Sequence, residues 1–315
     1  MPGRNEINNE IRQLRSEGPH DIVRRKYLRK LNNITERNVI AYYSGFLQKP
    51  TINETSICDD DINGLMNVMH GLDKEKGLDI LLHTEGGNTA ATEAIVGYLR
   101  CVFGNDVRAI VPQMAMSAGT MIACSCKEII MGKQSSLGPI DPQFGGMSGY
   151  GLIEVFEKAL QDAVDRPNTI PIWNHILSGY HPTLVGDCKK AIEWSGNMLI
   201  NWLENGMFKD SENSKEKAEN VANILNNNEV TKNHARHIGI GEAQSIGLKI
   251  IPLEEIQKDE GFQDIVLSAH HAYMATFADT YAYKIIENHN GRALIYNNIT
   301  EEDEEDSVLS SVDSI

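Results

Sequence analysis

Two glycine-bearing segments of this 315-residue chain carry the groups that could do chemistry. Residues 83–87 read HTEGG, and residues 115–120 read AMSAGT. If Ser117 starts a helix, free backbone N–H groups and the helix dipole lie beside its hydroxyl, and both favour negative charge on an attacked carbonyl oxygen. The N–H of Ala118 can donate to that oxygen, and a glycine pair lets a second N–H approach without an intervening side chain. The pattern therefore indicates acyl transfer, with Ser117 as nucleophile.

The elements around these segments predict an α/β fold. Each segment follows a short, mostly apolar run, at 78–82 and at 107–112, as expected for strands covered on both faces. We expect further strands at 38–45 and 128–131, and helices from residue 59, at 89–102, 117–126, 152–164, 185–204 and 214–226. Alternation of strand, turn and helix predicts parallel βαβ units. Both glycine segments would then lie at the carboxyl edge of one sheet, where ligands bind.

Composition changes along the chain predict four regions. We expect a charged helical arm at 1–37, a catalytic core at 38–253, a helical region at 254–299 and a disordered acidic tail at 300–315. The tail begins with the acidic run TEEDEED at 300–306. No internal repeat is evident.

The net charge of −15 argues against nucleic acid as a direct partner. The arm nevertheless carries a basic cluster, which we interpret as a solvated face or a subunit contact: Arg12, Arg15, Arg24, Arg25, Lys26, Arg29 and Lys30. Five cysteines, an odd number, and a polar start without a secretory signal indicate free thiols in the cytoplasm. No apolar run is long enough to cross a bilayer, and no spacing of His and Cys predicts a metal site.

Ser117 also has a structural interpretation. Its segment is not the G-x-S-x-G elbow of α/β hydrolases, and a serine before a small-residue helix can act simply as the helix N-cap. The pairing with the Gly86-Gly87 segment favours the catalytic interpretation.

Residues 38–253 resemble the serine dehydrogenase proteinase family of Clp-fold serine proteases, which is related to the signal-peptide peptidases. The resemblance is carried by LLHTEGGNTAATEAIVGYLR, VPQMAMSAGTMIACSCKEIIMGKQSSLGPIDPQ, GDCKKAIEWS and IGIGEAQSIGLKI. It implies a Clp/crotonase-like spiral of βαβ units that assembles into rings or stacked homo-oligomers. It also implies Ser117 as nucleophile, with an oxyanion hole from the backbone of Gly87, beside Gly86, and of Ala118.

The chain departs from this family at the positions that would complete the site. Glu85 stands where relatives have Pro, and we expect it to face solvent. Asp141 stands near the place of the triad His of Clp peptidases, and would either brace its turn or orient a base. The signal-peptide-peptidase branch uses Lys instead, which acts as a base only when burial lowers its pKa. Lys190 is the first candidate, Lys158 the second and Lys189 the third.

Two histidines, His234 and His237, precede the last family motif. We interpret them as structural, with a base role toward a neighbouring subunit as the alternative.

The expected activity is hydrolysis of peptides or proteins through an acyl-enzyme, with a Ser-Lys dyad and without cofactor or metal. ATP dependence would have to come from an activating partner, because the chain has no phosphate loop. Two alternatives stay open. One is an acyl-CoA-handling relative, although the core has no basic cluster for the CoA phosphates. The other is an inactive scaffold of the same fold.

Overall fold

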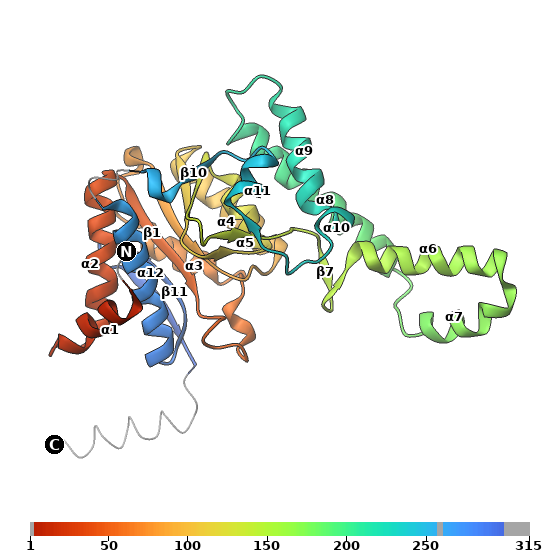
Figure 1. Ribbon diagram of the computed structural model, residues 1–315, viewed down its shortest axis with the longest axis horizontal. Helices are drawn as coiled ribbons and strands as arrows, with labels where there is room; N and C mark the ends of the chain where they lie inside the picture. The colour runs from red at the N-terminus through yellow and green to blue at the C-terminus, as the bar shows by residue number, and fades with distance from the viewer. Residues whose placement is uncertain (1–2, 257–260, 299–315) are drawn as a thin grey trace, which may run out of the picture. The chain divides into compact units, whose positions relative to one another are not determined.

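The computed structural model describes residues 3–256 and 261–298 (Figure 1). The chain forms two compact units: residues 1–103 together with 253–315 make unit 1, and residues 104–252 make unit 2. The acidic tail expected at 300–315 lies outside the described residues.

The strands of unit 1 lie in the order β2-β1-β11-β12. Their bounds are β1 Asn38–Ser44, β2 Leu78–His83, β11 Ala282–Asn288 and β12 Ala293–Asn297. Strand β1 runs parallel to β2 and antiparallel to β11. Every residue of β1 and β2 is buried, which explains their nearly continuous apolar sequence.

Helices cover the strands of unit 1. They are α1 Arg4–Gln13, α2 Pro19–Thr35, α3 Asp61–Met69, α4 Thr89–Phe103 and α12 Phe262–Asp279. Helix α3 joins β1 to the parallel β2, so the predicted βαβ unit is present. Helix α2 packs on α12 and β1, as Figure 1 shows. The region after residue 253, expected to be helical, is a helix followed by the hairpin of β11 and β12.

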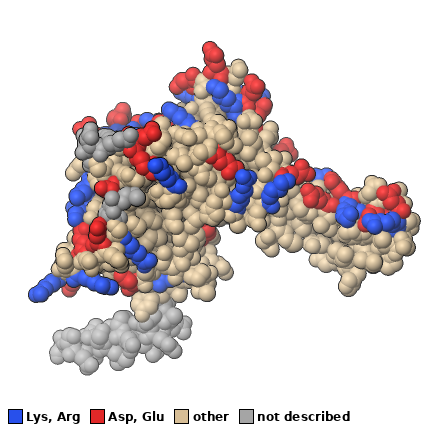
Figure 2. Space-filling model, in the orientation of Figure 1, with Lys and Arg blue, Asp and Glu red and all other residues tan. Residues whose placement is uncertain are grey.

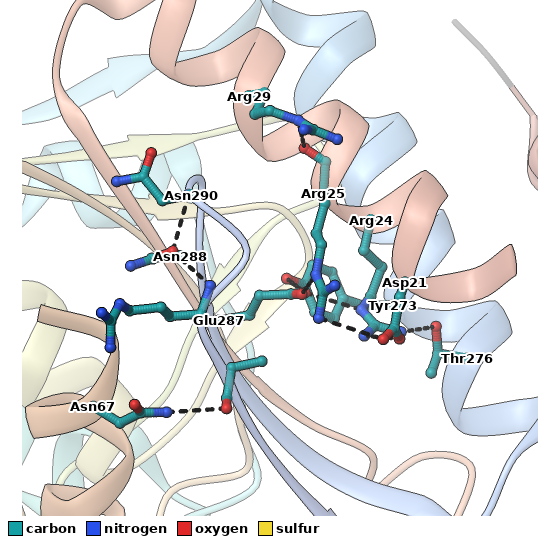
Figure 3. A network of polar contacts seen from close by, with 12 residues as sticks. Asp21, Arg24, Arg25, Arg29, Asn67, Tyr273, Thr276, Glu287, Asn288 and Asn290 are labelled. Carbon is teal, nitrogen blue, oxygen red and sulfur yellow. Dashed lines mark hydrogen bonds and ion pairs between the residues drawn. The ribbon is translucent and has the colours of Figure 1, made fainter. Parts of the chain in front are cut away.

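A buried ionic network joins α2 to β11 and α12 (Figure 3). Nε of Arg24 lies 3.1 Å from Oε2 of Glu287, and Nε of Arg25 lies 2.6 Å from Oε1 of the same carboxylate. The hydroxyl of Tyr273 donates to Oε2 of Glu287 at 3.0 Å. Arg24 and Glu287 are fully buried. The basic cluster is therefore not simply a solvated face, since two of its arginines hold the arm against the strands.

His270 of α12 is a second buried polar group of unit 1. Its ring centroid lies 5.2 Å from that of His83, and its Nδ1 lies 3.5 Å from the hydroxyl of Tyr43. Burial, followed by the proximity of His83 and His271, lowers the pKa of His270 well below its ordinary value. This imidazole is therefore neutral in the folded chain at neutral pH.

We expect the free energy of unfolding to fall as the pH drops below about 6.5, the ordinary value for an unfolded imidazole. The unfolded chain takes up a proton there that folded His270 does not, so stability decreases by up to about 1.4 kcal/mol per pH unit until the folded group titrates. Urea unfolding at pH 7.5 and 5.5 measures the loss. His270→Phe should lose less between the two pH values than the wild type, whereas the exposed His181→Gln should match the wild type. An equal loss in His270→Phe would contradict the assignment.

Unit 2 contains three groups of strands. Strands β3 Val107–Val111, β5 Glu128–Met131 and β10 Ile250–Pro252 pair in parallel in the order β10-β5-β3. Strands β4 Met114–Ala115, β6 Ser136–Leu137 and β9 Ile238–Gly239 lie in the order β4-β6-β9. Strands β7 Gln143–Phe144 and β8 Met147–Ser148 form a hairpin. Helix α5 lies between the parallel β3 and β5 in the chain, which gives a second βαβ unit.

The helices of unit 2 include a buried one and an exposed hairpin. Their bounds are α5 Ala118–Ser125, α6 Gly149–Asp165, α7 Ile170–Leu177, α8 Leu184–Asn205, α9 Ser214–Asn226, α10 Asn228–Thr231 and α11 Ile240–Ser245. Every residue of α5 is buried. Helices α6 and α7 pack on each other as a helical hairpin. On the face that Figure 2 shows, charged side chains gather along α6, whereas α7 shows almost none.

Within residues 3–256 and 261–298, no helix is both long and apolar enough to span a bilayer. All five cysteines are free thiols.

Candidate functional site

Ser117 occupies a strained turn between β4 and the buried helix α5. Its backbone has φ +50° and ψ −117°, a conformation that costs a non-glycine residue about 1–3 kcal/mol. Thr120 fixes the turn, because its hydroxyl donates to the carbonyl of Ala115 at 2.7 Å and accepts from the N–H of Gly138 at 2.8 Å. The chain thus supports a costly backbone geometry at the residue that the sequence marks as nucleophile.

The hydroxyl of Ser117 makes no capping hydrogen bond to α5 within the part of the chain that the structure describes. The side chain is half-buried rather than packed in the interior. The N–H of Gly119 is used by the carbonyl of Met116 at 2.7 Å, while Ala118, the first residue of the helix, has no carbonyl one turn earlier within the helix. The helix-cap interpretation of Ser117 therefore lacks its defining bond.

The Gly86-Gly87 turn of unit 1 is held by the segment at Ile57. The N–H of Ile57 donates to the carbonyl of Gly86 at 2.8 Å, and the N–H of Asn88 donates to the carbonyl of Ile57 at 2.9 Å. In this parallel bridge the groups flanking Gly87 face Ile57, so the N–H of Gly87 itself points to the opposite side. The turn therefore presents the kind of backbone donor that an oxyanion hole requires.

Gly87 tolerates no side chain in this arrangement. Its φ is +156°, and a Cβ would lie 2.4 Å from both the backbone N and the backbone O of Ile57. The family resemblance implies Gly87 as an oxyanion donor, and the turn must move to admit a methyl group, so we expect Gly87→Ala to lower kcat by about 10²–10³-fold, the usual effect of removing one such donor. Steady-state peptide hydrolysis measures the loss. Gly97→Ala in α4, where a Cβ meets nothing within 4 Å, is the matched control and should keep full activity. Full activity of Gly87→Ala would remove this turn from the site.

Glu85 does not simply face solvent, as the sequence suggested. The hydroxyl of Ser44 donates to its Oε2 at 2.7 Å, and the hydroxyl of Thr55 donates to its Oε1 at 2.6 Å. The carboxylate thus ties the end of β1 and the segment before Ile57 to the glycine turn.

The three candidate lysines are exposed. The side chain of Lys190 is 81% accessible, and its Nζ lies 3.6 Å from Oδ1 of Asp187 on the same helix. Lys189 and Lys158 are exposed as well. A solvated lysine stays protonated at neutral pH and cannot accept a proton from serine. None of these three lysines has, among the described residues, the burial that a lysine base needs.

Asp141 is buried and gathers three hydrogen-bond partners. Its Oδ1 lies 2.8 Å from Nδ1 of His234, and its Oδ2 accepts from Nε2 of Gln143 at 2.9 Å and from Nδ2 of Asn228 at 3.0 Å. The negative charge of Asp141, after burial, raises the pKa of Tyr150. Of the two sequence interpretations, Asp141 both braces its turn and orients an imidazole.

A cavity of about 280 Å³ lies beside this cluster. Tyr150 lines it together with Glu193, three aliphatic or glycine positions of α8, Ala222 of α9 and four asparagines: Asn197, Asn223, Asn226 and Asn227. Asn226 itself is engaged, because its Nδ2 donates to the carbonyl of Ile192 at 2.9 Å. The wall is rich in amide groups able to bond a polar substrate group.

The contact between Asp141 and His234 escaped the sequence analysis. The two residues are 93 positions apart, and the only signals were a carboxylate in the place of a triad histidine and a histidine before a family motif.

Residues 16–257 match the family of ClpP-like SDH-type serine proteinases. The chain belongs to this family. The resemblance predicted from the glycine and serine motifs is thereby confirmed, as is the ClpP-like α/β fold, with mostly parallel strands flanked by helices.

Two archaeal proteins of Methanocaldococcus jannaschii are similar to this ClpP-like chain. The uncharacterized protein MJ0137 is 29% identical over 234 residues, which cover 73% of each chain. The uncharacterized protein MJ1495 is 29% identical over 107 residues, which cover 34% of this chain and 36% of the relative.

Proposed function

We propose that this protein is a serine peptidase that hydrolyses peptide bonds of peptides or proteins through an acyl-enzyme on Ser117. The hydroxyl attacks the substrate carbonyl, and the backbone N–H of Ala118 donates to the oxyanion that forms; Gly87 is the second donor that the family resemblance implies. No metal or organic cofactor takes part in this scheme. The observation that carries the proposal is the strained, uncapped and half-exposed serine at the start of α5 in a chain of the serine proteinase family.

The Ser-Lys dyad expected from the sequence would need a neighbouring subunit to bury one of the lysines. Lys190, Lys158 and Lys189 are all exposed in the described chain. The geometry of unit 2 favours a base of another kind, and the lysine variants become controls for it.

The proposed activity is tested by comparing substrates. Purified protein should hydrolyse casein or short fluorogenic peptides, and should not turn over acyl-CoA thioesters or hydrate enoyl-CoA. Turnover of acyl-CoA without peptide hydrolysis would overturn the proposal in favour of a crotonase-type enzyme. Absence of both activities, with and without cell extract to supply an activating partner, would favour a scaffold.

We also propose that the protein is a homo-oligomer and that the helical hairpin of α6 and α7 contacts a second copy. Leu160 and Val164, one turn apart on α6, are 71% and 77% exposed, and Ile172 and Ile176 repeat this spacing on α7. Ring assembly of Clp-type proteases makes a second copy the occupant that this apolar stripe fits best.

Leu160→Glu with Val164→Glu should therefore lower the molar mass measured by light scattering to that of a smaller assembly, because each subunit would place two carboxylates in an apolar contact. Lys158→Ala, on another side of the same helix, should keep the wild-type mass. A wild-type mass of about 35 kDa would show that the chain is a monomer.

Free thiols at all five cysteines support a reducing compartment, and we propose the cytoplasm.

A further inference from the structure

The small sheet of unit 2 brings three polar residues to one edge, by which we mean the side where β4 and β6 end and β9 begins. Strand β4 runs parallel to β6, with Ala115 opposite Leu137, and β9 runs antiparallel to β6, with Ile238 opposite Leu137. The chain leaves β4 and β6 at the edge from which it enters β9. Ser117 and Asp141 follow their strands at this edge, and His234 precedes β9 there.

The spacing of this sheet suits a relay of side chains. Neighbouring strands lie about 4.8 Å apart, so β4 and β9 are separated by about 10 Å with β6 between them. A serine and a histidine side chain, with a hydrogen bond joining them, together span such a gap. The chain after β6 also passes close to the serine turn, because a Cβ at Gly138 would lie 3.4 Å from Cα of Met116.

His234 is held in the orientation that a general base needs. Its Nδ1 lies 2.8 Å from Oδ1 of the buried Asp141, and the tautomer that suits this contact has Nδ1–H donating a hydrogen bond to the carboxylate. The opposite nitrogen, Nε2, is then the acceptor. With its side chain 29% exposed, His234 is reachable from a substrate site.

We propose that His234, oriented by Asp141, is the proton acceptor for Ser117. The chain order of this triad is serine, aspartate, histidine. The inference rests on the proposed peptidase function and names the base that it requires.

The steps balance without any further reactant than water. The bond between Oγ of Ser117 and the carbonyl carbon forms while the hydroxyl proton passes to Nε2 of His234, and the carbonyl electron pair moves to oxygen. The imidazolium then protonates the leaving nitrogen as the C–N bond breaks. Water, deprotonated by the same Nε2, then attacks the acyl carbon. The bond between that carbon and Oγ breaks, the imidazolium returns its proton to Oγ, and the acyl group leaves as a carboxylic acid.

His237 provides a matched control from the same loop. Its Nδ1 lies 2.8 Å from the hydroxyl of Ser136, a neutral partner, and its side chain is exposed. No carboxylate orients it among the described residues, so it lacks the charge that stabilises an imidazolium.

The test compares His234→Ala with His237→Ala and Lys190→Ala, using hydrolysis of a fluorogenic peptide and the rate of labelling of Ser117 by a fluorophosphonate. We expect His234→Ala to lower both kcat and the labelling rate by about 10²–10⁴-fold with little change in KM, and the two controls to stay within about threefold of the wild type. Added imidazole should restore part of the activity of His234→Ala, which a merely structural role of His234 would not allow. Circular dichroism verifies that each variant is folded.

Near-normal labelling and hydrolysis in His234→Ala would overturn this inference and leave the serine mechanism intact. So would an unrescued loss in His234→Ala together with an equal loss in Lys190→Ala. Failure of the peptidase proposal has a different signature, because the wild type would then hydrolyse no peptide, or hydrolysis would survive in Ser117→Ala.

Discussion

Ser117→Ala should lower kcat/KM for peptide hydrolysis by about 10⁴-fold or more, because removal of the nucleophile of a serine protease leaves only the catalysis that binding and the oxyanion hole provide. The backbone of the variant can keep its conformation, so the loss should occur in kcat while KM changes little. Steady-state kinetics on a fluorogenic peptide measures both constants. Ser245→Ala, which removes an exposed serine hydroxyl bonded to the carbonyl of Glu242, is the matched control and should stay fully active.

Ser117→Gly separates the catalytic role of this position from its structural cost. Glycine adopts φ +50° without the strain that serine bears there, so this variant should be inactive yet as stable as the wild type or more stable. A gain in stability that accompanies the loss of activity is typical of a strained functional site. Circular dichroism and the unfolding midpoint check this expectation. A Ser117→Gly variant that is unfolded, or whose midpoint is far below that of the wild type, would contradict it.

Glu287→Gln should lower the free energy of unfolding by about 3–5 kcal/mol, the largest effect on stability that we expect from a single change. The substitution places a neutral amide beside the buried Arg24, whose remaining ion-pair partner is the half-buried Asp21, and it removes one of the two carboxylates that pair with Arg25. Burial lowers the pKa of Arg24, while Glu287 and other partners raise it, with a net rise in the wild type. The guanidinium stays charged after the change, because an arginine side chain is not deprotonated in proteins. A buried charge that loses its fully buried partner is the costly outcome.

Urea unfolding, followed by circular dichroism, measures this loss. Arg29→Gln is the matched control, because the Nε of Arg29 only donates to the carbonyl of Arg25 on its own helix, and its loss should be within about 0.5 kcal/mol. A loss below about 1 kcal/mol in Glu287→Gln would show that the network adds little to the attachment of α2.

Many helices and strands were predictable because the spacing of apolar residues along each of them is regular. Strands such as LDILL at β2 are buried on both faces, and α9 spans the 214–226 predicted for it. The C-terminal hairpin was missed, because β11 carries Lys284 and Glu287 among its apolar residues. Both charges are satisfied only by distant partners, since Lys284 lies 2.9 Å from Asp61 and Glu287 pairs with the arm.

Only the parts of the candidate site that depend on adjacent residues could be proposed from the sequence. Ser117 and Gly87 are local features, since a turn after a strand can be recognised from a few adjacent residues. The neighbours of Asp141 could not be predicted, because His234 and Asn228 reach it only through the folding of α8 and α9. Burial of a lysine depends on tertiary packing, and helix periodicity alone could not show that Lys190 points into solvent.

The central claim is that one serine hydroxyl is activated, and covalent labelling tests it most directly. The protein is incubated with a fluorophosphonate, digested and mapped by mass spectrometry. We predict that the label occupies the peptide containing Ser117 in the wild type and is absent from Ser117→Ala, with labelling abolished by prior heat unfolding. Labelling that is unchanged in Ser117→Ala, or a folded wild type whose Ser117 stays unlabelled while it hydrolyses peptide, would contradict the account.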